Sequence, residues 1–326
     1  MELTAASLLP LVDAVDPVLP AVLASHDARA RLRARAAALP FVPFMLLECH
    51  LGIAPGRLDL SAGAHTGPAA RALLDAAHIP WRDEFGCAET FLLEYDLDSP
   101  ERAPSVFAGF DVRAQPELAQ MLALARALQP ASPTRLDALR RALSALPDDV
   151  KITHLGVMTG RPMSPFRVNA RATSADALRR YAAAIGIRTP LVTALDRLLD
   201  DAEPFVRRFV LAIDLAERPS PRLGVECYSD PAAGDDDWTA LLAHLVSRAY
   251  CAQAESDALR HWAGSAWSSR FMVPEQQRRL AEFLEPARRG VVTRGLNHVK
   301  LTVEPGAPPR AKAYLAVNRH EHGAPA

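Results

Sequence analysis

Charged side chains recur at every second position in several short segments of the chain. Most cations of this set lie in its C-terminal half, namely Arg167, Arg171, Lys300 and Lys312. Most acids lie nearer the N-terminus, namely Glu48, Asp59, Glu94, Asp96 and Asp111. Basic groups gathered in one place bind anions, and a carboxylate beside them can orient or deprotonate a nucleophile. The set predicts a site for a ligand with an anionic part and a nucleophilic or cationic part.

The composition is that of an ordinary globular protein, and it excludes several classes of partner. The chain has 326 residues, of which 49% are hydrophobic and 23% charged, with a net charge of −1. This balance gives no overall field for binding nucleic acid or an anionic membrane. No apolar run reaches the roughly 18 residues of a membrane span. The N-terminus lacks the basic region of a secretory signal, so we expect a cytoplasmic protein.

Familiar metal and cofactor motifs are missing from the sequence. The cysteines Cys49, Cys87, Cys227 and Cys251 form no CxxC pair, and there is no HExxH, Walker A, GxGxxG or GxSxG motif. We therefore expect no protein-bound metal and no required cofactor. The functional argument depends instead on how the elements arrange the polar residues.

Five pairs of segments have the pattern of β-hairpins, because most arms alternate apolar and polar residues and every joint is rich in Gly, Pro, Ser or Asp. The pairs are 44–51 with 57–62, 90–97 with 105–113, 150–158 with 165–171, 208–215 with 222–229, and 298–303 with 310–317. Stretches typical of amphipathic helices lie between them, at 67–77, 115–128, 132–146, 174–185, 190–199, 237–260 and 274–288. We expect a single domain over residues 44–318, a helical segment packed on it at 1–43, and a flexible tail at 319–326.

Each expected strand has one apolar and one polar face, because successive side chains point to opposite sides. Helices would cover the apolar face, whereas the polar face has two possible fates. One is an open antiparallel sheet with helices on one side and water on the other. The other is a closed ten-stranded barrel with a polar lumen that can hold a ligand. The polar positions carry Glu, Asp, His, Arg, Asn and Tyr, which favours an α+β fold of five helix–hairpin units closed into the barrel.

This order of hairpins and helices resembles that of the ABBA-type prenyltransferases, which are soluble enzymes built as a ten-stranded antiparallel barrel ringed by helices. The resemblance covers roughly residues 44–318 and is architectural. Its most family-like residues are Lys312 and Tyr314 in AKAY, the basic segment PFRVNAR, and a strand glutamate at Glu48 or Glu94. Like that family, the chain lacks an aspartate-rich DDxxD motif.

The resemblance implies transfer of a short prenyl group from an allylic diphosphate to a small aromatic or peptide side-chain acceptor. The diphosphate would be held by Arg167, Asn169, Arg171, Lys300 and Lys312. Tyr228 and Tyr314 would shield the carbocation, and Glu94 or Glu48 would act on the acceptor. Other residues expected in the lumen are Arg57, Asp59, Arg113, Glu226 and His298. No cofactor is required, and Mg²⁺ is a possible companion of the diphosphate.

Two departures from the family keep other functions open. Aromatic residues make up only 6% of the chain, and the expected lumen positions Gly109, Gly224 and Ala316 are small, which favours a larger acceptor such as a peptide. The segments RLGVECYS and GLNHVKLTV are similar to uncharacterised bacterial proteins associated with ribosomal peptide natural-product pathways. The alternatives are a non-catalytic barrel that binds a peptide or metabolite in such a pathway, and another peptide-modifying enzyme on the same fold.

Overall fold

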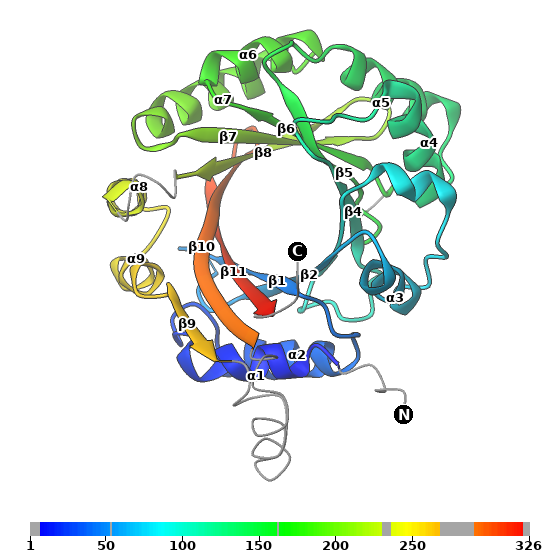
Figure 1. Cartoon of the computed structure of the whole chain (residues 1–326). Coiled ribbons are helices and arrows are strands. Elements are labelled where there is room, and N and C mark those ends of the chain that lie inside the picture. The colour runs from blue at the N-terminus through cyan, green and yellow to red at the C-terminus, as the bar shows by residue number, and fades with distance from the viewer. Residues whose placement is uncertain (1–6, 53, 162, 230–235, 268–289, 322–326) are drawn as a thin grey trace.

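The strands of the chain form one antiparallel sheet that curls into a ring (Figure 1). The computed structural model describes residues 7–52, 54–161, 163–229, 236–267 and 290–321. The strands are β1 (Phe44–His50), β2 (Leu58–His65), β3 (Thr90–Tyr95), β4 (Ser105–Gly109), β5 (Lys151–Val157), β6 (Phe166–Ala172), β7 (Arg208–Leu215), β8 (Pro219–Tyr228), β9 (Gly264–Trp267), β10 (Gly290–Val303) and β11 (Arg310–Glu321).

Two pairings between strands far apart in the sequence close the ring. Strand β11 pairs with β1, which places Glu48 opposite Tyr314, and β8 pairs with β10, which places Glu226 opposite Lys300. Pairings between neighbouring strands complete the barrel, and β9 lies outside it along β10. The expected ten-stranded barrel is therefore confirmed, and the open-sheet alternative is wrong.

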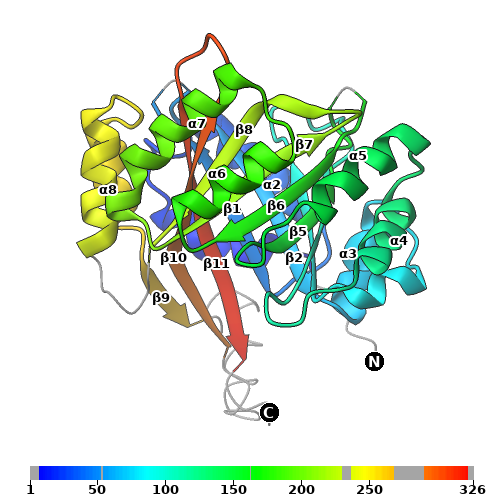
Figure 2. The same cartoon turned by 90° about the horizontal axis from the view of Figure 1, so that it is seen from above.

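Helices form an outer layer around the barrel, as Figures 1 and 2 show from two directions. They are α1 (Leu9–Val15), α2 (His26–Ala37), α3 (Pro68–Ala76), α4 (Leu118–Leu128), α5 (Pro133–Ser144), α6 (Ala175–Ala184), α7 (Thr189–Ala202), α8 (Asp236–Ser247) and α9 (Gln253–Arg260), with short 3-10 turns at η1 (Asp16–Val18), η2 (Asp83–Cys87) and η3 (Glu203–Phe205). Serine caps begin three of them, because Ser25, Ser132 and Ser174 each accept a hydrogen bond from the first turn. Within the described residues, no helix is long and apolar enough to cross a membrane.

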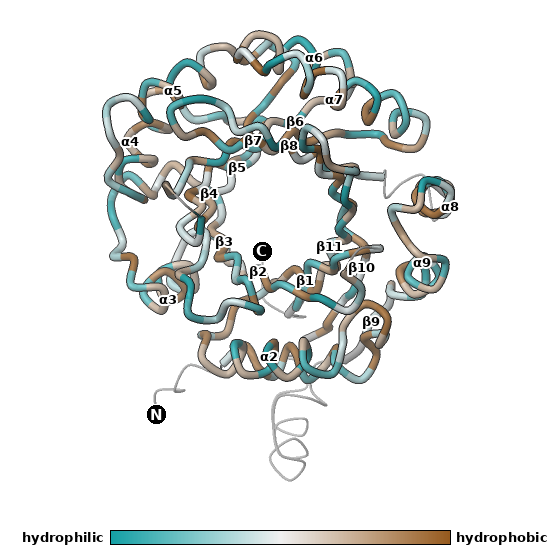
Figure 3. The backbone as a smooth tube through the Cα atoms, turned by 180° about the vertical axis from the view of Figure 1, so that it is seen from behind, coloured by the Kyte–Doolittle hydropathy of each residue, from teal (hydrophilic) through white to brown (hydrophobic). Residues whose placement is uncertain are grey.

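The hydrophobic core lies between the outer face of the barrel and the helices. On the strands, every second side chain points outward and is buried there, including Leu47, Leu93, Val168, Leu211 and Leu315. Helix α7 presents Leu191, Leu195 and Leu198 to this core at helical spacing. Hydrophilic and hydrophobic residues alternate along the outer helices (Figure 3). The polar faces of the strands are left to line the lumen.

The structure changes several expected boundaries. Strand β4 ends at Gly109, and residues 110–113 leave the sheet. Strands β10 and β11 are longer than expected because they continue to pair as far as Gly290 and Glu321, so residues 319–321 belong to a strand and not to a tail. The expected helix 237–260 is two helices, α8 and α9, and β9 was not expected. The expected helix 274–288 lies outside the described residues.

Gly156 on β5 provides the space for an aromatic ring inside the barrel. A Cβ atom there would lie 2.7 Å from Cε1 of Phe107 and 2.8 Å from the carbonyl oxygen of Val106. We expect Gly156→Ala to lower the free energy of unfolding by about 1–3 kcal/mol, because overpacking forces backbone shifts. Chemical denaturation measures this loss. Gly295→Ala is the matched control, since its Cβ would meet no atom of the described residues within 4 Å. Equal stability of the two variants would contradict the expected overpacking at Gly156.

Candidate active site

The polar faces of the strands enclose a lumen with three connected parts. The main cavity has a volume of about 420 Å³ and is lined by residues that include Phe107, Asn169, Tyr228, His298 and Tyr314. Next to it lies a polar layer formed by Glu48, Glu94, Arg161, Arg167, Asp214, Arg222, Lys300 and Lys312. The second opening, of about 300 Å³, lies beyond this layer and is lined by residues that include Arg57, Asp59, Asp96, Arg102 and Arg310.

Three cations predicted to hold a diphosphate are each paired with a carboxylate in the polar layer or beside it. Arg167 donates from Nε and Nη2 to the two oxygens of Asp214, at 2.7 and 3.0 Å. Lys300 Nζ lies 3.1 Å from Oε1 of Glu226, and Lys312 bonds to Glu48. Such pairing is what allows charges to be buried, because an isolated charge loses its hydration without compensation.

The ion pairs keep three buried carboxylates ionised. Burial alone would raise the pKa of Glu226, but the charges of Lys300, His298 and His154, together with the hydrogen bond from Lys300, lower this pKa to about 2. Burial likewise opposes ionisation of Glu48, and the charges of Lys312 and His50 lower its pKa below the ordinary value. The pKa of Asp214 is lowered in the same way, by Arg167 against the effect of burial. These three carboxylates act as fixed negative charges.

Glu94 on β3 differs from the other acids of the polar layer. It lines the main cavity, the polar layer and the second opening, so it lies where the three parts meet. Among the described residues, none forms a hydrogen bond or ion pair with its carboxylate. Burial and the negative charge of Glu48 raise its pKa above the ordinary value, although Arg167, Lys300 and Lys312 act in the other direction. A carboxylate with these properties is suited to accept a proton from a bound ligand.

Three aromatic rings form a stack on one wall of the main cavity. The ring of His298 lies 4.1 Å from that of Tyr314, at an interplanar angle of 18°, and 4.8 Å from that of Tyr228. Both tyrosines are tethered to the acids, since Tyr228 donates to Glu226 Oε2 at 3.1 Å and Tyr314 bonds to Glu48. Burial raises the pKa of both phenols well above the ordinary value, so they stay neutral. The stack lines the cavity with aromatic surface, and a cation of the protein already lies on it, since the guanidinium of Arg208 is 4.2 Å from the centroid of the Tyr228 ring.

The remaining predicted residues lie in different places. Arg171 lines the main cavity near Arg208, and burial and this neighbouring charge lower its pKa. Arg57 lies in the second opening, where it pairs with Asp96 and Asp98. Arg113 was expected in the lumen, but this is wrong. Because β4 ends at Gly109, Arg113 lies in an exposed turn, where its backbone N–H bonds to Asp111.

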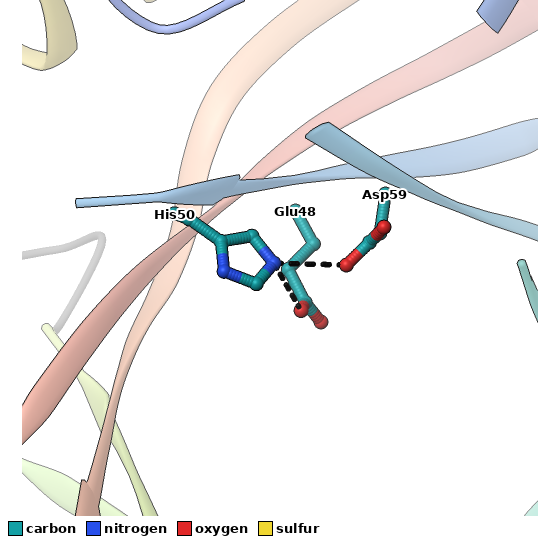
Figure 4. Close-up of side chains that lie close together, drawn as sticks. All are labelled: Glu48, His50 and Asp59. Carbon is teal, nitrogen blue, oxygen red and sulfur yellow. Dashed lines mark hydrogen bonds and ion pairs between the residues drawn. The ribbon is translucent and has the colours of Figure 1, made fainter. Parts of the chain in front are cut away.

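Glu48, His50 and Asp59 form a compact group at the second opening (Figure 4). His50 Nε2 lies 2.9 Å from Asp59 Oδ2 and 3.6 Å from Glu48 Oε1. One imidazole with two carboxylates does not match Mg²⁺, which prefers a shell of oxygen ligands and water. These side chains also satisfy one another and Lys312, so the group does not fit a magnesium site.

The small residues of the lumen make room for neighbouring side chains. A Cβ at Gly224 would lie 2.5 Å from Cε of Lys300, and one at Gly109 would overlap the hydroxyl of Thr90. These two glycines therefore accommodate protein atoms, and they are not evidence for a larger acceptor. Ala316 does line the main cavity, as expected.

Sequence reasoning missed several residues of the lumen. Asp214 is the one acid in the strand RFVLAIDL, and its position two residues after Ala212 indicates an inward side chain. Phe107 follows the inward alternation of β4 with Ser105 and Gly109. Arg161 lies in the loop between β5 and β6 and bonds to Asp214, and no pattern within a loop indicates this.

Comparisons with known proteins support the description of the fold. Neither a protein-family model nor a curated protein matches the sequence. Among solved structures, the prenyltransferase PriB in its binary complex with product diphosphate is similar, with a TM-score of 0.52 at 16% identity over 95% of this chain and 96% of PriB. A 6-dimethylallyl tryptophan synthase has a TM-score of 0.51 at 14% identity over 95% of both chains. AnaPT from Neosartorya fischeri has a TM-score of 0.50 at 13% identity over 97% of this chain and 92% of AnaPT.

These structures define the class of fold to which the chain belongs. Nearly the whole length of each protein is aligned, so the likeness extends over the barrel and its helices. The chain has the fold of the ABBA-type prenyltransferases.

The raised pKa of Glu94 predicts a pH-dependent gain in stability when its charge is removed. A group whose pKa is higher in the folded than in the unfolded state stabilises the fold below the unfolded value, and this stability is lost as the pH rises through the folded value. Glu94→Gln should therefore raise Tm by about 2 °C or more at pH 8 and leave it nearly unchanged near pH 4. Thermal unfolding at both pH values checks this.

The matched control is Glu89→Gln, which changes an exposed carboxylate that also lines the main cavity. It should change Tm little at either pH. A loss of stability in Glu94→Gln at pH 8 would show that partners stabilise the ionised carboxylate, and this would contradict a raised pKa for Glu94.

Proposed function

We propose that this protein is a prenyltransferase that transfers a short prenyl group from an allylic diphosphate to an aromatic or peptide side-chain acceptor inside the barrel. The observation that carries this proposal is the arrangement of the lumen. Converging cations adjoin a stack of aromatic rings, and the carboxylate of Glu94, which has no partner among the described residues, lies beside both. The fold shared with PriB, solved with product diphosphate, supports it.

The polar layer is suited to receive the diphosphate. Its cations Arg161, Arg167, Arg222, Lys300 and Lys312 outnumber its carboxylates Glu48, Glu94 and Asp214. Each paired cation keeps further N–H groups for a ligand, because an ammonium has three donors and a guanidinium five. When the bond between the allylic carbon and oxygen breaks, the electron pair stays on the diphosphate. Fixed positive charges stabilise the negative charge that develops there.

The aromatic stack is suited to shield the allylic cation that remains. Tyr314 is the better placed of the two tyrosines, because the Tyr228 ring already has His298 against it and the guanidinium of Arg208 over it, 4.2 Å from its centroid. The barrel wall limits access of water. Because both phenols stay protonated, they are poor nucleophiles and do not capture the cation.

Glu94 is suited to complete the transfer. The acceptor forms a new bond to the allylic carbon and must then lose a proton. The carboxylate of Glu94 takes this proton, and its raised pKa makes it a stronger base than an ordinary glutamate. Glu48 is less suited to this role, because Lys312 and His50 hold its carboxylate. Of the two glutamates considered, we therefore assign Glu94 as the base.

One observation favours a second function, a non-catalytic barrel that binds a peptide or metabolite. Arg167, Lys300 and Lys312 are each paired with a carboxylate, so these three cations already have partners without a diphosphate. Such a barrel would bind its ligand without turnover. The two functions differ in whether the polar layer binds a prenyl diphosphate.

A thermal-shift experiment with unreactive dimethylallyl and geranyl thio-diphosphates separates the two functions. A ligand that binds only the folded state raises Tm, and a ligand at about 100 times its Kd adds about 2.7 kcal/mol. We expect a rise of several degrees that exceeds the rise with pyrophosphate or phosphate, since the prenyl chain adds apolar contact. Each measurement is made with Mg²⁺ and with EDTA, which tests whether Mg²⁺ accompanies the diphosphate.

The double variant Lys312→Met with Glu48→Gln removes one cation together with its carboxylate, so no buried charge is left without a partner. It should reduce the shift with the thio-diphosphates strongly. Arg113→Gln, an exposed arginine outside the lumen, is the control and should shift as the wild type does. Equal Tm shifts in the wild type, the double variant and the control, or no shift in any of them, would contradict diphosphate binding in the polar layer. Either result would favour the non-catalytic binding barrel.

A further inference from the structure

A groove of about 690 Å³ lies outside the barrel, on the side that α5, α6 and α7 cover (Figure 1). Its walls come from α5, the turn between α6 and α7, the turn between β7 and β8 with the adjoining end of β8, and the turn between β10 and β11. Among the described residues, none that lines this groove also lines the main cavity, the polar layer or the second opening. The groove is therefore separate from the candidate active site, and its volume is in the range of binding sites, about 300–1,000 Å³.

The apolar lining of the groove is rigid. Three aliphatic side chains that line it are buried in the hydrophobic core, namely Ile187, Leu191 and Leu215. Four prolines line it as well, namely Pro190, Pro219, Pro221 and Pro305. A proline ring has no rotamer freedom to lose when a partner packs against it, so little conformational entropy opposes binding at this surface.

The turn between α6 and α7 has a fixed geometry. Gly186 has a φ of +77°, a conformation that favours glycine, and it follows the end of α6. Its N–H donates to the carbonyl oxygen of Ala183 at 3.0 Å, and the N–H of Ile187 donates to that of Ala182 at 3.1 Å. Helix α7 then begins at Thr189. Backbone hydrogen bonds therefore hold this wall of the groove in place before any partner binds.

Three arginines line the groove without a charge partner. They are Arg141 on α5, Arg188 just before α7 and Arg218 in the turn between β7 and β8, and all three are exposed. Among the described residues, no carboxylate forms an ion pair or hydrogen bond with any of them. Glu217 is the one acid among the described residues that line the groove. Three arginines against one glutamate leave the groove positively charged, in a chain whose net charge is −1.

Neighbouring arginines on the same helices are paired, unlike those of the groove. Arg140 on α5 forms an ion pair with Asp137, and neither residue lines the groove. Arg180 on α6 pairs with Asp149 in the same way. Within the described residues, no side chain caps the start of α7, and no acid lies in its first turn. The partial positive charge of this helix end therefore adds to that of Arg188 beside it.

We propose that this groove docks a short segment of a partner protein in which aliphatic residues are flanked by aspartate and glutamate. The aliphatic side chains pack against the proline-lined wall, and the carboxylates pair with Arg141, Arg188 and Arg218. Because these arginines come from three separate elements, a segment with several acids matches them better than a small molecule with one anionic group. Exposed ion pairs are individually weak, so the apolar contact supplies most of the affinity and the arginines supply selectivity.

Selection from a random heptapeptide library displayed on phage tests which segments the full-length protein binds. The groove variant removes the three charges by the substitutions Arg141→Gln, Arg188→Gln and Arg218→Gln. A control variant removes three exposed arginines that do not line the groove, by the substitutions Arg82→Gln, Arg113→Gln and Arg126→Gln. Both variants have the same net charge, and both should keep the wild-type Tm because all six positions are exposed.

We expect wild type and the control variant to enrich peptides that carry two or more acids beside Leu, Ile or Val, and the groove variant not to enrich them. Fluorescence anisotropy of one enriched peptide, labelled with fluorescein, then measures affinity. The groove variant should bind it about tenfold or more weakly than wild type, which corresponds to the loss of about 1.4 kcal/mol. Raising NaCl from about 0.05 to about 0.5 M should also weaken binding severalfold, because salt screens exposed charges.

A second pair of variants locates the peptide without changing any charge. Ala184→Trp adds a large ring at an exposed position that lines the groove. Ala183→Trp adds the same ring at the preceding exposed position, which does not line the groove. The first should weaken binding of the enriched peptide severalfold, and the second should leave it unchanged.

Several results would overturn the proposal. They are no enrichment by wild type, enrichment of basic or uncharged peptides, equal enrichment by the groove and control variants, and equal affinity of Ala184→Trp and Ala183→Trp. Two further results would assign the groove to another occupant. A dimer in sedimentation that dissociates in the groove variant would assign it to a second copy of this chain. A rise in Tm with dodecanoate, without peptide enrichment, would assign it to a small apolar anion. None of these measurements involves the lumen, so the proposed function stands or fails separately.

Discussion

Charge pairing inside the lumen is the constraint on which the rest of the barrel depends. The three pairs that bury cations of the polar layer all join strands of different hairpins. Glu48 with Lys312 connects β1 to β11, Arg167 with Asp214 connects β6 to β7, and Glu226 with Lys300 connects β8 to β10. Two of these strand pairings, β1 with β11 and β8 with β10, are the ones that close the ring. A register shift of one residue in such a strand pair would turn the charged side chains toward the helices. The ion pairs and the register of the strands therefore support each other.

Glu94 is the exception that links this architecture to function. Its carboxylate lies near Arg167, Lys300 and Lys312, which are paired with other acids, and its pKa is raised by burial and by Glu48. The folded protein would therefore be more stable if Glu94 were uncharged. Such a cost in stability is common at functional sites. The main cavity beside it is lined by two buried polar atoms, Nε2 of His298 and Oδ1 of Asn169, that have no hydrogen-bond partner among the described residues.

The fold was largely predictable from the sequence, and the site only in part. Alternation along PFRVNAR and AKAY indicates which side chains face inward, and the structure places Arg167, Asn169, Lys312 and Tyr314 in the lumen. The alternation of apolar and polar residues predicts an inward side chain only within a strand. Because β4 ends at Gly109, the lumen position predicted for Arg113 is wrong. Alternation also does not reveal ion-pair partners, because Asp214 meets Arg167 through the pairing of β6 with β7, and Arg161 reaches Asp214 from a loop. The stack around His298 depends on a β-bulge between Leu296 and His298, which no local pattern reveals.

The central claim is that the paired cations of the polar layer receive a prenyl diphosphate beside the aromatic stack. A crystal structure with dimethylallyl thio-diphosphate tests it most directly. We expect phosphate oxygens within hydrogen-bond distance of Arg167, Lys300 and Lys312, with the prenyl chain against Tyr314 and His298 and the Glu94 carboxylate facing the open cavity. A thio-diphosphate bound outside the lumen, with all three ion pairs undisturbed and the prenyl chain away from the stack, would contradict it.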